Sequence, residues 1–424
     1  PLTDMPNRLL FTERINQALK TAQQSGKQFA LLYFDLDRFK NINDSFGHLF
    51  GDYILRMVAE RLTAEFRGPD TVARLGGDEF VLLFSDIEGP ADVFEAAERI
   101  VRAFRKPFHT NARDFFLTAS IGVTIFPDHG EDSDTLVSNA DLAMYHAKRL
   151  GGDRFRVFTT GMQKEVIRRI NLENYLRRAW EVENFDLLYQ PLVDAATCRL
   201  TGAEALLRWN DLGIGPVSPS EFIPLAEETG LILPLGYWVL ERACRQVRQW
   251  RESGLPDVHV SVNVTARQLS EARFPEELRR ILQAADVKSD ALTVEITEDT
   301  LMSSTRQSIE LLRELKETGV QISIDDFGTG YSSLSYLKRF PVDTLKIDRS
   351  FVFDLPEDKD SVAIVRSILA LAKNLGLKVI AEGVETRPQL DFLTTEGCDG
   401  IQGFYFSRPV SGHQIMGAYP VGER

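Results

Sequence analysis

The sequence predicts two domains of different fold class: an α+β domain with an antiparallel-rich sheet in residues 1–160, and a TIM-like (β/α)8 barrel in residues 181–424. Three observations support this division. The chain has 424 residues, more than one hydrophobic core usually serves. Its second half alternates short apolar runs with helical patterns, which is typical of parallel strands joined by helices. Its first part places two apolar runs on either side of a four-residue turn, which is typical of an antiparallel hairpin.

The first domain is expected to begin with a helix in NRLLFTERINQALKTAQQSG, which leads into the strand FALLYFDLD. A helical stretch from Gly51 to Phe66 follows, and then the strands DTVARL and FVLLFS, joined by the residues from Gly76 to Glu79. The helix ADVFEAAERIVRAF, the strand FFLTASIGVTIF and the helix SDTLVSNADLAMYHAKRLG complete the domain. Residues 161–180 are helical in pattern and rich in charge, so we expect a helical linker that merges into the first barrel helix.

The barrel strands are expected in LLYQPLV, AEALLRW, HVSVNV, LTVEIT, VQISIDDF, TLKID, KVIAEGV and GIQGFYF. Between most of them lie helical patterns with an apolar stripe, such as WVLERACRQVRQWRESG and SVAIVRSILALAKNLG. Each of these two patterns ends on a glycine, as expected of a helix C-cap. In barrels of this type the C-terminal ends of the strands carry the chemistry.

Charge and composition narrow the functional classes. The net charge of −13 argues against binding to nucleic acids, which needs a basic surface. The three cysteines lack CxxC spacing and indicate neither a disulfide framework nor a zinc site, which is typical of a reducing cytoplasm. No apolar run reaches the roughly 18 residues of a membrane span, so no membrane contact is expected of this segment. We expect a cytoplasmic protein, or the cytoplasmic part of a longer membrane-anchored sensor.

Acidic and amide residues stand at the downstream ends of apolar runs in the second half: Glu204, Asn263, Glu295, Asp325, Asp326 and Glu382, with Lys346 and Gln402 ending two further runs. A single strand-end acid usually caps a helix or forms a turn. So many on successive strands instead predict a metal site on one rim of the barrel, because a buried carboxylate is costly without a partner. Oxygen ligands suit Mg²⁺ or Mn²⁺, and two such ions are a standard device for hydrolysing phosphodiesters.

A phosphate-pairing cation is expected beside this rim. Glu204 and Arg208 lie four residues apart in one strand and therefore share a face. One face of the strand could then present both a metal ligand and an arginine that pairs with phosphate.

The first domain has a smaller acidic cluster. Asp35 and Asp37 end the strand FALLYFDLD, and the hairpin carries Asp78 and Glu79. If the hairpin lies beside that strand, Asp35 and Asp78 converge on a metal ion, in the two-acid arrangement that polymerases use. A Gly-Gly-Asp-Glu turn is, however, more often only a hairpin, since tight turns need the positive φ that glycine allows.

The second half resembles the EAL domain, the cyclic di-GMP phosphodiesterase family. The resemblance rests on EALLRW, SVNVTARQL, VEITE, DDFGTGYSSL, LKIDRSF, AEGVE and QGFYFSRP, which follow in the family's order over nearly the whole segment. It implies that one metal is bound by Glu204, Asn263, Glu295 and Asp325, and a second by Asp325, Asp326 and Glu382. It also implies roles for six further residues: catalysis at Lys346 with Asp348 and Gln402 nearby, substrate contact at Gln190 and Arg208, and tethering of the DDFGTGYSSL loop by Glu298.

The first half resembles the GGDEF domain, the diguanylate cyclase family, which has a palm-like cyclase fold. The resemblance rests on LTDMPNR, DLDRFKNINDSFGHLFGD, RLGGDEF, SIGVTIF and ADLAMYHAK. It implies metal binding by Asp35, Asp78 and the Leu36 carbonyl, and a reaction centre lined by Gly76, Gly77 and Glu79. It further implies guanine contacts from Asn43 and Asp52, and phosphate contacts from Lys40 and Lys148. Arg67 and Asp70 have the spacing of the family's inhibitory RxxD site, although a charged surface turn would look the same.

The sequence departs from the GGDEF pattern at one place. After Lys148 the family usually shows Gly-Arg-Asn, whereas this chain has Gly151, Gly152 and Asp153 before Arg154. Losing that cation should weaken triphosphate binding, and Arg154 could substitute in part. We therefore expect hydrolysis of cyclic di-GMP to linear pGpG by the barrel, and a first domain that condenses two GTP or binds GTP to regulate the barrel.

Two alternatives remain open from the sequence. One is a net diguanylate cyclase whose barrel is restrained, and the other is a receptor that binds cyclic di-GMP without turning it over. The complete set of barrel acids and Lys346 argue against the receptor. A homodimer is expected, because condensation needs two GTP-loaded domains that face each other and the barrel family also works as a dimer.

Overall fold

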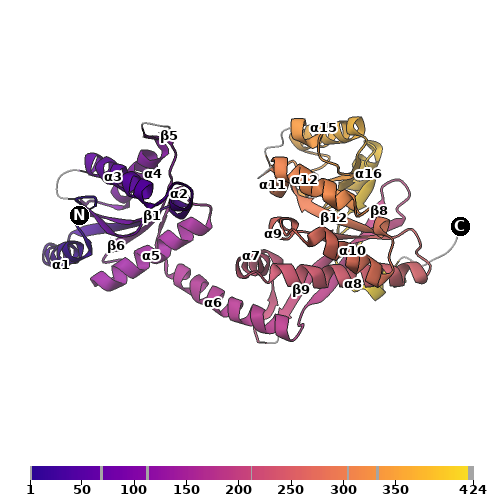
Figure 1. Cartoon of the computed structure of the whole chain (residues 1–424), viewed down its shortest axis with the longest axis horizontal. Coiled ribbons are helices and arrows are strands. Elements are labelled where there is room, and N and C mark those ends of the chain that lie inside the picture. Colours follow the sequence, from indigo (N-terminus) through magenta and orange to yellow (C-terminus); the bar gives the residue numbers. More distant parts are fainter. Residues whose placement is uncertain are drawn as a thin grey trace. The chain divides into compact units, whose positions relative to one another are not determined.

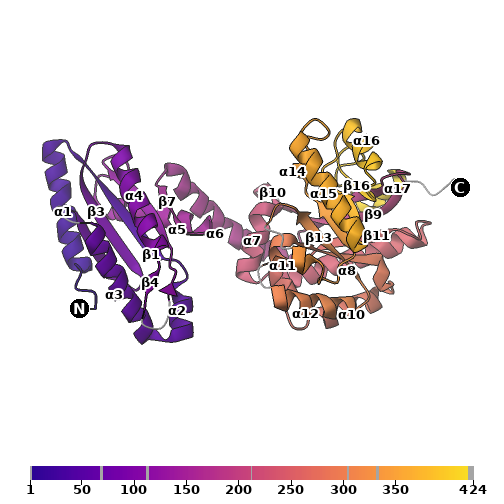
Figure 2. The ribbon, with the colours of Figure 1, turned by 90° about the horizontal axis from the view of Figure 1, so that it is seen from above.

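The computed structural model describes residues 2–66, 70–110, 114–211, 213–302, 305–330 and 334–418. The chain forms two compact units, Pro1–Ile170 and Asn171–Arg424, each with its own hydrophobic core (Figures 1 and 2). Helix α6 (Thr160–Glu181) covers the residues for which a helical linker is expected. Within the described ranges, no helix has both the length and the apolar character needed to cross a lipid bilayer.

The first unit has the predicted α+β architecture. Its helices are α1 (Arg8–Ser25), α2 (Phe39–Phe46), α3 (His48–Glu65), α4 (Pro90–Arg105) and α5 (Ser133–Arg149). Its strands are β1 (Gln28–Leu36), β2 (Thr71–Gly76), β3 (Glu79–Ile87), β4 (Phe108–His109), β5 (Asp114–Phe115), β6 (Ala119–Phe126) and β7 (Arg154–Val157). The main sheet has the order β2-β3-β1-β6-β7, in which β6 and β7 are parallel and the other neighbours are antiparallel. Helix α2 was not predicted from the sequence.

Helices cover both faces of this sheet (Figure 1). Side chains of α1 and α5 pack with Phe29, Leu31 and Tyr33 of β1 on one face. Side chains of α3 and α4 pack with Leu32 and Phe34 on the other. Strand β1 is therefore buried on both sides, which accounts for its nearly continuous apolar sequence.

The second unit is a closed barrel, as predicted. Its strands are β8 (Asp186–Asp194), β9 (Leu200–Asp211), β10 (Gly215–Val217), β11 (His259–Asn263), β12 (Leu292–Thr297), β13 (Gln321–Phe327), β14 (Thr344–Ile347), β15 (Lys378–Ala381) and β16 (Gly400–Gln402). Its helices are α7 (Pro219–Thr229), α8 (Ile232–Glu252), α9 (Ala266–Leu269), α10 (Phe274–Ala285), the short 3-10 turn η1 (Ser289–Ala291), α11 (Glu298–Met302), α12 (Thr305–Lys316), α13 (Leu334–Leu337), α14 (Arg349–Val352), α15 (Lys359–Leu375), α16 (Arg387–Thr395) and α17 (Gly412–Ala418).

Strand β8 departs from a regular (β/α)8 barrel. It closes the sheet by pairing with both β9 and β16, and it runs antiparallel to both. The cause is local, because β8 and β9 are joined by a tight turn instead of a helix. In that turn the Asp194 carboxylate accepts a hydrogen bond from the Thr197 backbone N–H at 2.7 Å, and Cys198 has a left-handed φ of 56°.

The barrel strands carry polar side chains on one face and apolar side chains on the other. Val262, Val294, Ile324 and Leu345 belong to the apolar core. The alternate face places small polar residues next to the predicted site residues, as in the pairs Ser261 and Asn263, Thr293 and Glu295, Ser323 and Asp325, and Thr344 and Lys346. Because strand side chains alternate with a period of two, this second face points into the barrel, where the site residues can meet.

Candidate active sites

Lys346 lies at the centre of the barrel site. Its side chain is 1% exposed, and its Nζ atom lies 2.7 Å from a Glu295 oxygen and 2.5 Å from a Glu382 oxygen. Nζ also lies 3.4 Å from oxygens of both Glu204 and Asp325. Four carboxylates from different strands or strand ends therefore surround one ammonium group inside the barrel.

The carboxylates of this cluster outnumber its one ammonium group, and the pKa values of several of these buried groups are shifted. Burial alone would lower the pKa of Lys346, but the surrounding carboxylates raise it well above its ordinary value, so the amine stays protonated. Burial raises the pKa of Glu295 well above its ordinary value and that of Glu382 to about 8, against the opposing effect of Lys346. Burial acts to raise the pKa of Glu204 too, but Lys346 and the hydrogen bonds from Gln402 and Asn263 together hold it below its usual value.

Asp325 and Asp326 both reach the same side of the site, as predicted for adjacent acids at a strand end. Asp326 has a left-handed φ of 53°, which breaks the alternation of the strand, and its backbone N–H donates to Asp325 Oδ1 at 3.0 Å. Carboxylate oxygens of Asp325, Asp326 and Glu382 all lie within 4.8 Å of one another. Burial, followed by Asp325 and Asp348, raises the pKa of Asp326 to about 6, which places Asp348 beside this group.

Amide side chains hold Glu204 from the other side. Asn263 Nδ2 donates to Glu204 Oε1 at 2.6 Å, and Gln402 Nε2 donates to Glu204 Oε2 at 2.6 Å. Gln402 Nε2 also lies 3.2 Å from Gln190 Oε1, and Gln190 Nε2 donates to the Ser407 carbonyl at 3.3 Å. Two of the predicted amides thus contact Glu204 directly, and Gln190 is joined to it through Gln402 and to the loop after β16 through Ser407.

Two further predicted residues flank the cluster. Burial lowers the pKa of Arg208 while the negative charge of Glu204 raises it, which places the guanidinium within electrostatic reach of the site. Glu298 is 1% exposed, and its Oε2 accepts a hydrogen bond from the Gly328 backbone N–H at 2.8 Å. Glu298 therefore holds the start of the predicted loop, of which residues 331–333 lie outside the described residues.

The donor set of the barrel fits divalent cations. Four carboxylates contact the Lys346 ammonium, and the carboxylate of Asp326 lies beside two of them, so the cluster has excess negative charge. Carboxylate and amide oxygens are the ligands that hard divalent ions prefer. Burial and the neighbouring carboxylates raise the pKa values of Glu295, Glu382 and Asp326, and a bound cation would offset both effects.

The acidic cluster of the first unit forms beside the hairpin. Asp35 pairs in register with Glu79 of β3, so the hairpin does lie beside β1. Asp35 is 8% exposed, and its Oδ1 lies 2.8 Å from Lys148 Nζ. Burial raises the pKa of Asp35 to about 6, Asp78 and Glu79 add to the rise, and Lys148 opposes it. Asp35, Asp78, Glu79 and Lys148 thus share one electrostatic site.

The other predicted residues of the first unit are distributed around this site. Gly76 and Gly77 have φ of 153° and 52°, values that favour glycine in the hairpin turn. Leu36 is the last residue of β1. Asn43 on α2 packs against Gly51 on α3, where an added Cβ would lie 2.0 Å from Asn43 Oδ1. Two remaining members complete the set: Asp52, which acts with Asp78 on Arg74, and Lys40, which is exposed on α2.

Asp37 has a role that the sequence did not reveal. Its carboxylate accepts hydrogen bonds from the Thr118 and Ser120 hydroxyls, both at 2.6 Å, and from the Asp153 backbone N–H at 2.9 Å. Asp37 therefore anchors the loop that follows α5, instead of facing the cluster around Asp35. Thr118 and Ser120 lie two residues apart, and this spacing of hydroxyls is the sequence signal that could have indicated the anchor.

This anchor explains the departure at Gly152. Gly152 has a φ of 72°, and a Cβ placed there would lie 2.6 Å from Asp37 Oδ2. An arginine does not fit at this position without moving the loop. Arg154 is exposed on β7, and its Nε donates to the Gly152 carbonyl at 2.9 Å.

The predicted inhibitory site is described only in part. Arg67 lies outside the described residues. Asp70 precedes β2, and its Oδ1 accepts a hydrogen bond from the Ser85 backbone N–H at 3.2 Å.

Family models match both units. The model of the EAL domain matches residues 173–409. The model described as "Diguanylate cyclase, GGDEF domain" matches residues 1–171.

Curated relatives match nearly the whole chain. The bifunctional diguanylate cyclase/cyclic di-GMP phosphodiesterase MucR of Pseudomonas aeruginosa is 44% identical over 98% of this chain and 60% of its own length. The cyclic di-GMP phosphodiesterase PdeR of Escherichia coli is 39% identical over 96% of this chain and 61% of its own length. This chain thus spans about 60% of the length of these two relatives.

A solved structure matches the barrel. It is described as the PaMucR phosphodiesterase in complex with c-di-GMP, and it is 46% identical to this chain with a TM-score of 0.56. The match covers 58% of this chain and 99% of that structure.

Proposed function

This chain belongs to the EAL domain family and carries a GGDEF domain ahead of the barrel, and we propose on this basis that it hydrolyses cyclic di-GMP to linear pGpG. The observation that carries the proposal is the convergence of four carboxylates on Lys346 inside the barrel, with the Asp326 carboxylate beside those of Asp325 and Glu382. A receptor that only binds its ligand has no need of this charge arrangement.

Domains of both families depend on divalent metal ions, and for the barrel we propose two ions, Mg²⁺ or Mn²⁺. One would be held by Glu204, Asn263, Glu295 and Asp325, and the other by Asp325, Asp326 and Glu382. When bound, such ions lower the pKa of water and offset the charge that develops on a phosphodiester.

The side chains around the metal ligands would divide the remaining work. Lys346 would orient the attacking water and hold the surrounding carboxylates in place, with Asp348 nearby. Arg208 would pair with a substrate phosphate. Gln190 and Gln402 would connect substrate contact to the position of Glu204, since the hydrogen bonds run in that order. Glu298 would fix the loop beside the metal ligands.

For the first unit we propose a GTP site. Asp35, Asp78 and the Leu36 carbonyl would bind Mg²⁺, and Asn43 and Asp52 would contact guanine. The phosphates would lie among the remaining residues, namely Gly76, Gly77, Glu79, Lys40 and Lys148. The unit would either condense two GTP, which requires a homodimer, or bind GTP and regulate the barrel, and Arg67 with Asp70 would form an inhibitory site.

A reducing cytoplasm, where GTP is available, is the setting that we propose. Cys198, Cys244 and Cys398 are all free, which is consistent with it.

One experiment separates these activities. The protein is incubated with cyclic di-GMP, and separately with GTP, in the presence of Mg²⁺ or Mn²⁺, and the products are separated by chromatography. Wild-type protein should produce pGpG, and Glu204→Ala should lower that rate at least about a hundredfold through loss of a metal ligand. The double variant Asp78→Ala/Glu79→Ala is the matched control and should still hydrolyse cyclic di-GMP. If cyclic di-GMP remains intact with Mg²⁺ and also with Mn²⁺, the proposed hydrolase activity is excluded.

The GTP arm decides the role of the first unit. Cyclic di-GMP that accumulates from GTP only in Glu204→Ala would identify a bifunctional enzyme in which hydrolysis dominates. GTP that is never consumed but speeds hydrolysis in wild-type protein, and not in the double variant, would identify a regulatory domain.

A further inference from the structure

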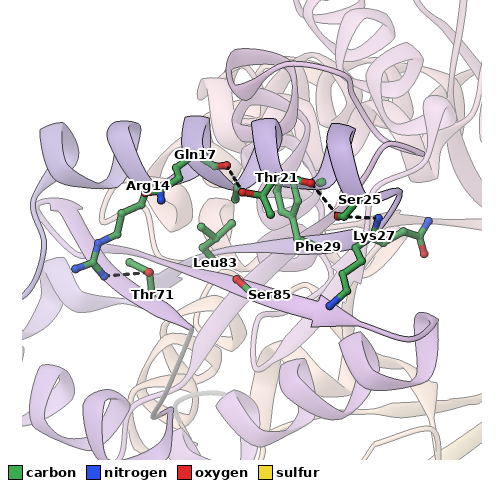
Figure 3. A pocket seen from close by; sticks show the side chains of 12 residues that line it. Arg14, Gln17, Thr21, Ser25, Lys27, Phe29, Thr71, Leu83 and Ser85 are labelled. Atoms are coloured by element: carbon green, nitrogen blue, oxygen red, sulfur yellow. Dashed lines mark hydrogen bonds between the residues drawn. The ribbon is translucent and has the colours of Figure 1, made fainter.

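A groove lies in the first unit between helix α1 and the edge of the sheet, and we call it the α1 groove (Figure 3). Its volume is about 410 Å³, and its walls come from α1, the turn into β1, and strands β1, β2 and β3. Thr71 opens β2 and Ser85 is near the end of β3, whereas the hairpin that joins these strands is at their opposite ends. The α1 groove is therefore separate from the site around Asp35 and Asp78.

The described residues that line the α1 groove carry positive charge in a strongly acidic chain. They include Arg14 and Lys27 and no aspartate or glutamate. The chain as a whole has a net charge of −13. Asp70 is next to Thr71 in sequence, but it is not among the lining residues, and its Oδ1 accepts from the Ser85 backbone. The local charge therefore favours an anion.

Arg14 is placed toward the groove by a buried hydroxyl. Its Nη1 donates to Thr71 Oγ1 at 3.0 Å, and Thr71 is 5% exposed. Within the described residues Arg14 has no carboxylate partner, so the rest of its guanidinium remains available for a ligand. Figure 3 shows Arg14 and Thr71 at one end of the groove and Lys27 toward the other.

The polar groups beside Arg14 are donors that lack acceptors. Thr71, Leu83 and Ser85 share one face of the sheet, because Thr71 pairs in register with Leu83 and Ser85 is two residues farther along β3. The Thr71 hydroxyl accepts from Arg14 and donates to no other described group, and the Ser85 hydroxyl forms no hydrogen bond among the described residues. The remaining N–H groups of the Arg14 guanidinium and two hydroxyls with no acceptor among the described residues are complementary to an oxyanion, and especially to phosphate, which accepts several such bonds at once.

We propose that the α1 groove binds the phosphate group of a small phosphate monoester. The phosphate would lie against Arg14, Thr71 and Ser85. The uncharged body of the ester would extend along α1 past Ala18 and Ala22, which also line the groove. This binding is independent of the proposed hydrolysis.

The test is calorimetric titration of the full chain in EDTA, with ribose 5-phosphate, inorganic phosphate and ribose as probes. Ribose 5-phosphate should bind more tightly than inorganic phosphate, and ribose should not bind. Arg14→Gln should weaken ribose 5-phosphate binding at least about tenfold, the usual scale for a lost charge-assisted contact. Lys20→Gln is the matched control, because Lys20 is an exposed cation on α1 that does not line the groove, and it should bind as wild type does.

Ser85→Ala provides a second variant that removes a hydroxyl without a partner and should keep the fold. It should also weaken binding, so the proposal remains testable if Arg14→Gln unfolds. Cyclic di-GMP hydrolysis should be the same in wild type, Arg14→Gln and Ser85→Ala. Equal affinity for ribose 5-phosphate in wild type and both groove variants would overturn the proposal, and so would loss of binding in Lys20→Gln to the same extent as in Arg14→Gln.

Discussion

Lys346 provides the positive charge that keeps the barrel carboxylates together. Breaking a buried ion pair by removing one partner costs about 3 to 5 kcal/mol, because the remaining charge is left without compensation. We therefore expect Lys346→Met to lower the free energy of unfolding of the barrel by about that amount in metal-free buffer. Chemical denaturation in EDTA measures this change.

The control for this prediction is Lys373→Met, since Lys373 is an exposed lysine on α15. Surface substitutions of this kind usually change stability by less than about 0.5 kcal/mol. A Lys346→Met protein as stable as Lys373→Met in EDTA would show that the carboxylates have another counter-ion.

Gly152 is a second residue whose substitution has a defined outcome. Gly152→Arg requires a left-handed backbone in a non-glycine residue and displaces the Asp37 carboxylate, which together cost about 1 to 3 kcal/mol. We expect the variant to destabilise the first unit in thermal unfolding and to leave its GTP affinity no higher. Gly161→Ala is the control, because a Cβ there meets only the Thr159 hydroxyl oxygen at 3.8 Å. Tighter GTP binding by Gly152→Arg would contradict the Asp37 anchor.

Residue types on successive strands were enough to predict which acidic side chains meet inside the barrel, but not how they are held. The contacts of Lys346 with four carboxylates could not be predicted from local sequence, because these carboxylates come from separate strands or strand ends. Asp37 shows the same limit. Its position at a strand end suggested a site residue, yet its partners Thr118, Ser120 and Asp153 are far away in sequence and turn it into an anchor.

At the scale of elements, hydrophobic patterning predicted the barrel strands well and their ends less well. Glu204 was expected near the end of its strand, but β9 continues to Asp211. The extension depends on pairing with β8 and β10, which no local pattern contains. The antiparallel direction of β8 likewise follows from the short turn at Asp194, where a helix was the ordinary expectation.

Strand β11 carries a histidine whose titration should affect stability. Burial lowers the pKa of His259 to about 4, against the opposing effect of its backbone hydrogen bond with Thr201, and Lys378 and Arg251 lower it further. An unfolded histidine has a pKa near 6.5. The unfolded state therefore binds more protons between these values, and the contribution of His259 to stability is present above about pH 6.5 and lost as the pH falls toward 4.

We expect His259→Gln to reduce this pH dependence. The free energy of unfolding, measured by denaturation from pH 7.5 to pH 4.5, should fall less steeply in the variant than in wild type. His413→Gln is the control, because His413 is exposed on α17. Identical slopes in wild type and His259→Gln would mean that the pKa of His259 is the same in the folded and unfolded states.

At the scale of the whole molecule, the two units have separate cores and separate acidic clusters. Separate cores predict two unfolding transitions, and separate acidic clusters predict that each transition responds to the ligand of its own unit. A ligand at a hundredfold excess over its dissociation constant stabilises the folded state by about 2.7 kcal/mol. The unfolding transition whose midpoint temperature rises with a ligand therefore identifies the unit that binds this ligand.

We expect Mn²⁺ or Mg²⁺ alone to raise the unfolding temperature of the barrel, because its five clustered carboxylates carry more negative charge than Lys346 can neutralise. Calorimetric scans with increasing metal should show this rise in wild type and a much smaller one in Asp325→Asn, since Asp325 belongs to both proposed metal sites. Asp343→Asn is the matched control, because Asp343 is a barrel aspartate paired with Lys316 at 2.7 Å and is outside the cluster. The unfolding temperature of Asp343→Asn without metal should be lower than that of wild type, but its rise on adding metal should be the same. An increment that survives in Asp325→Asn and is lost in Asp343→Asn would place the metal elsewhere in the barrel.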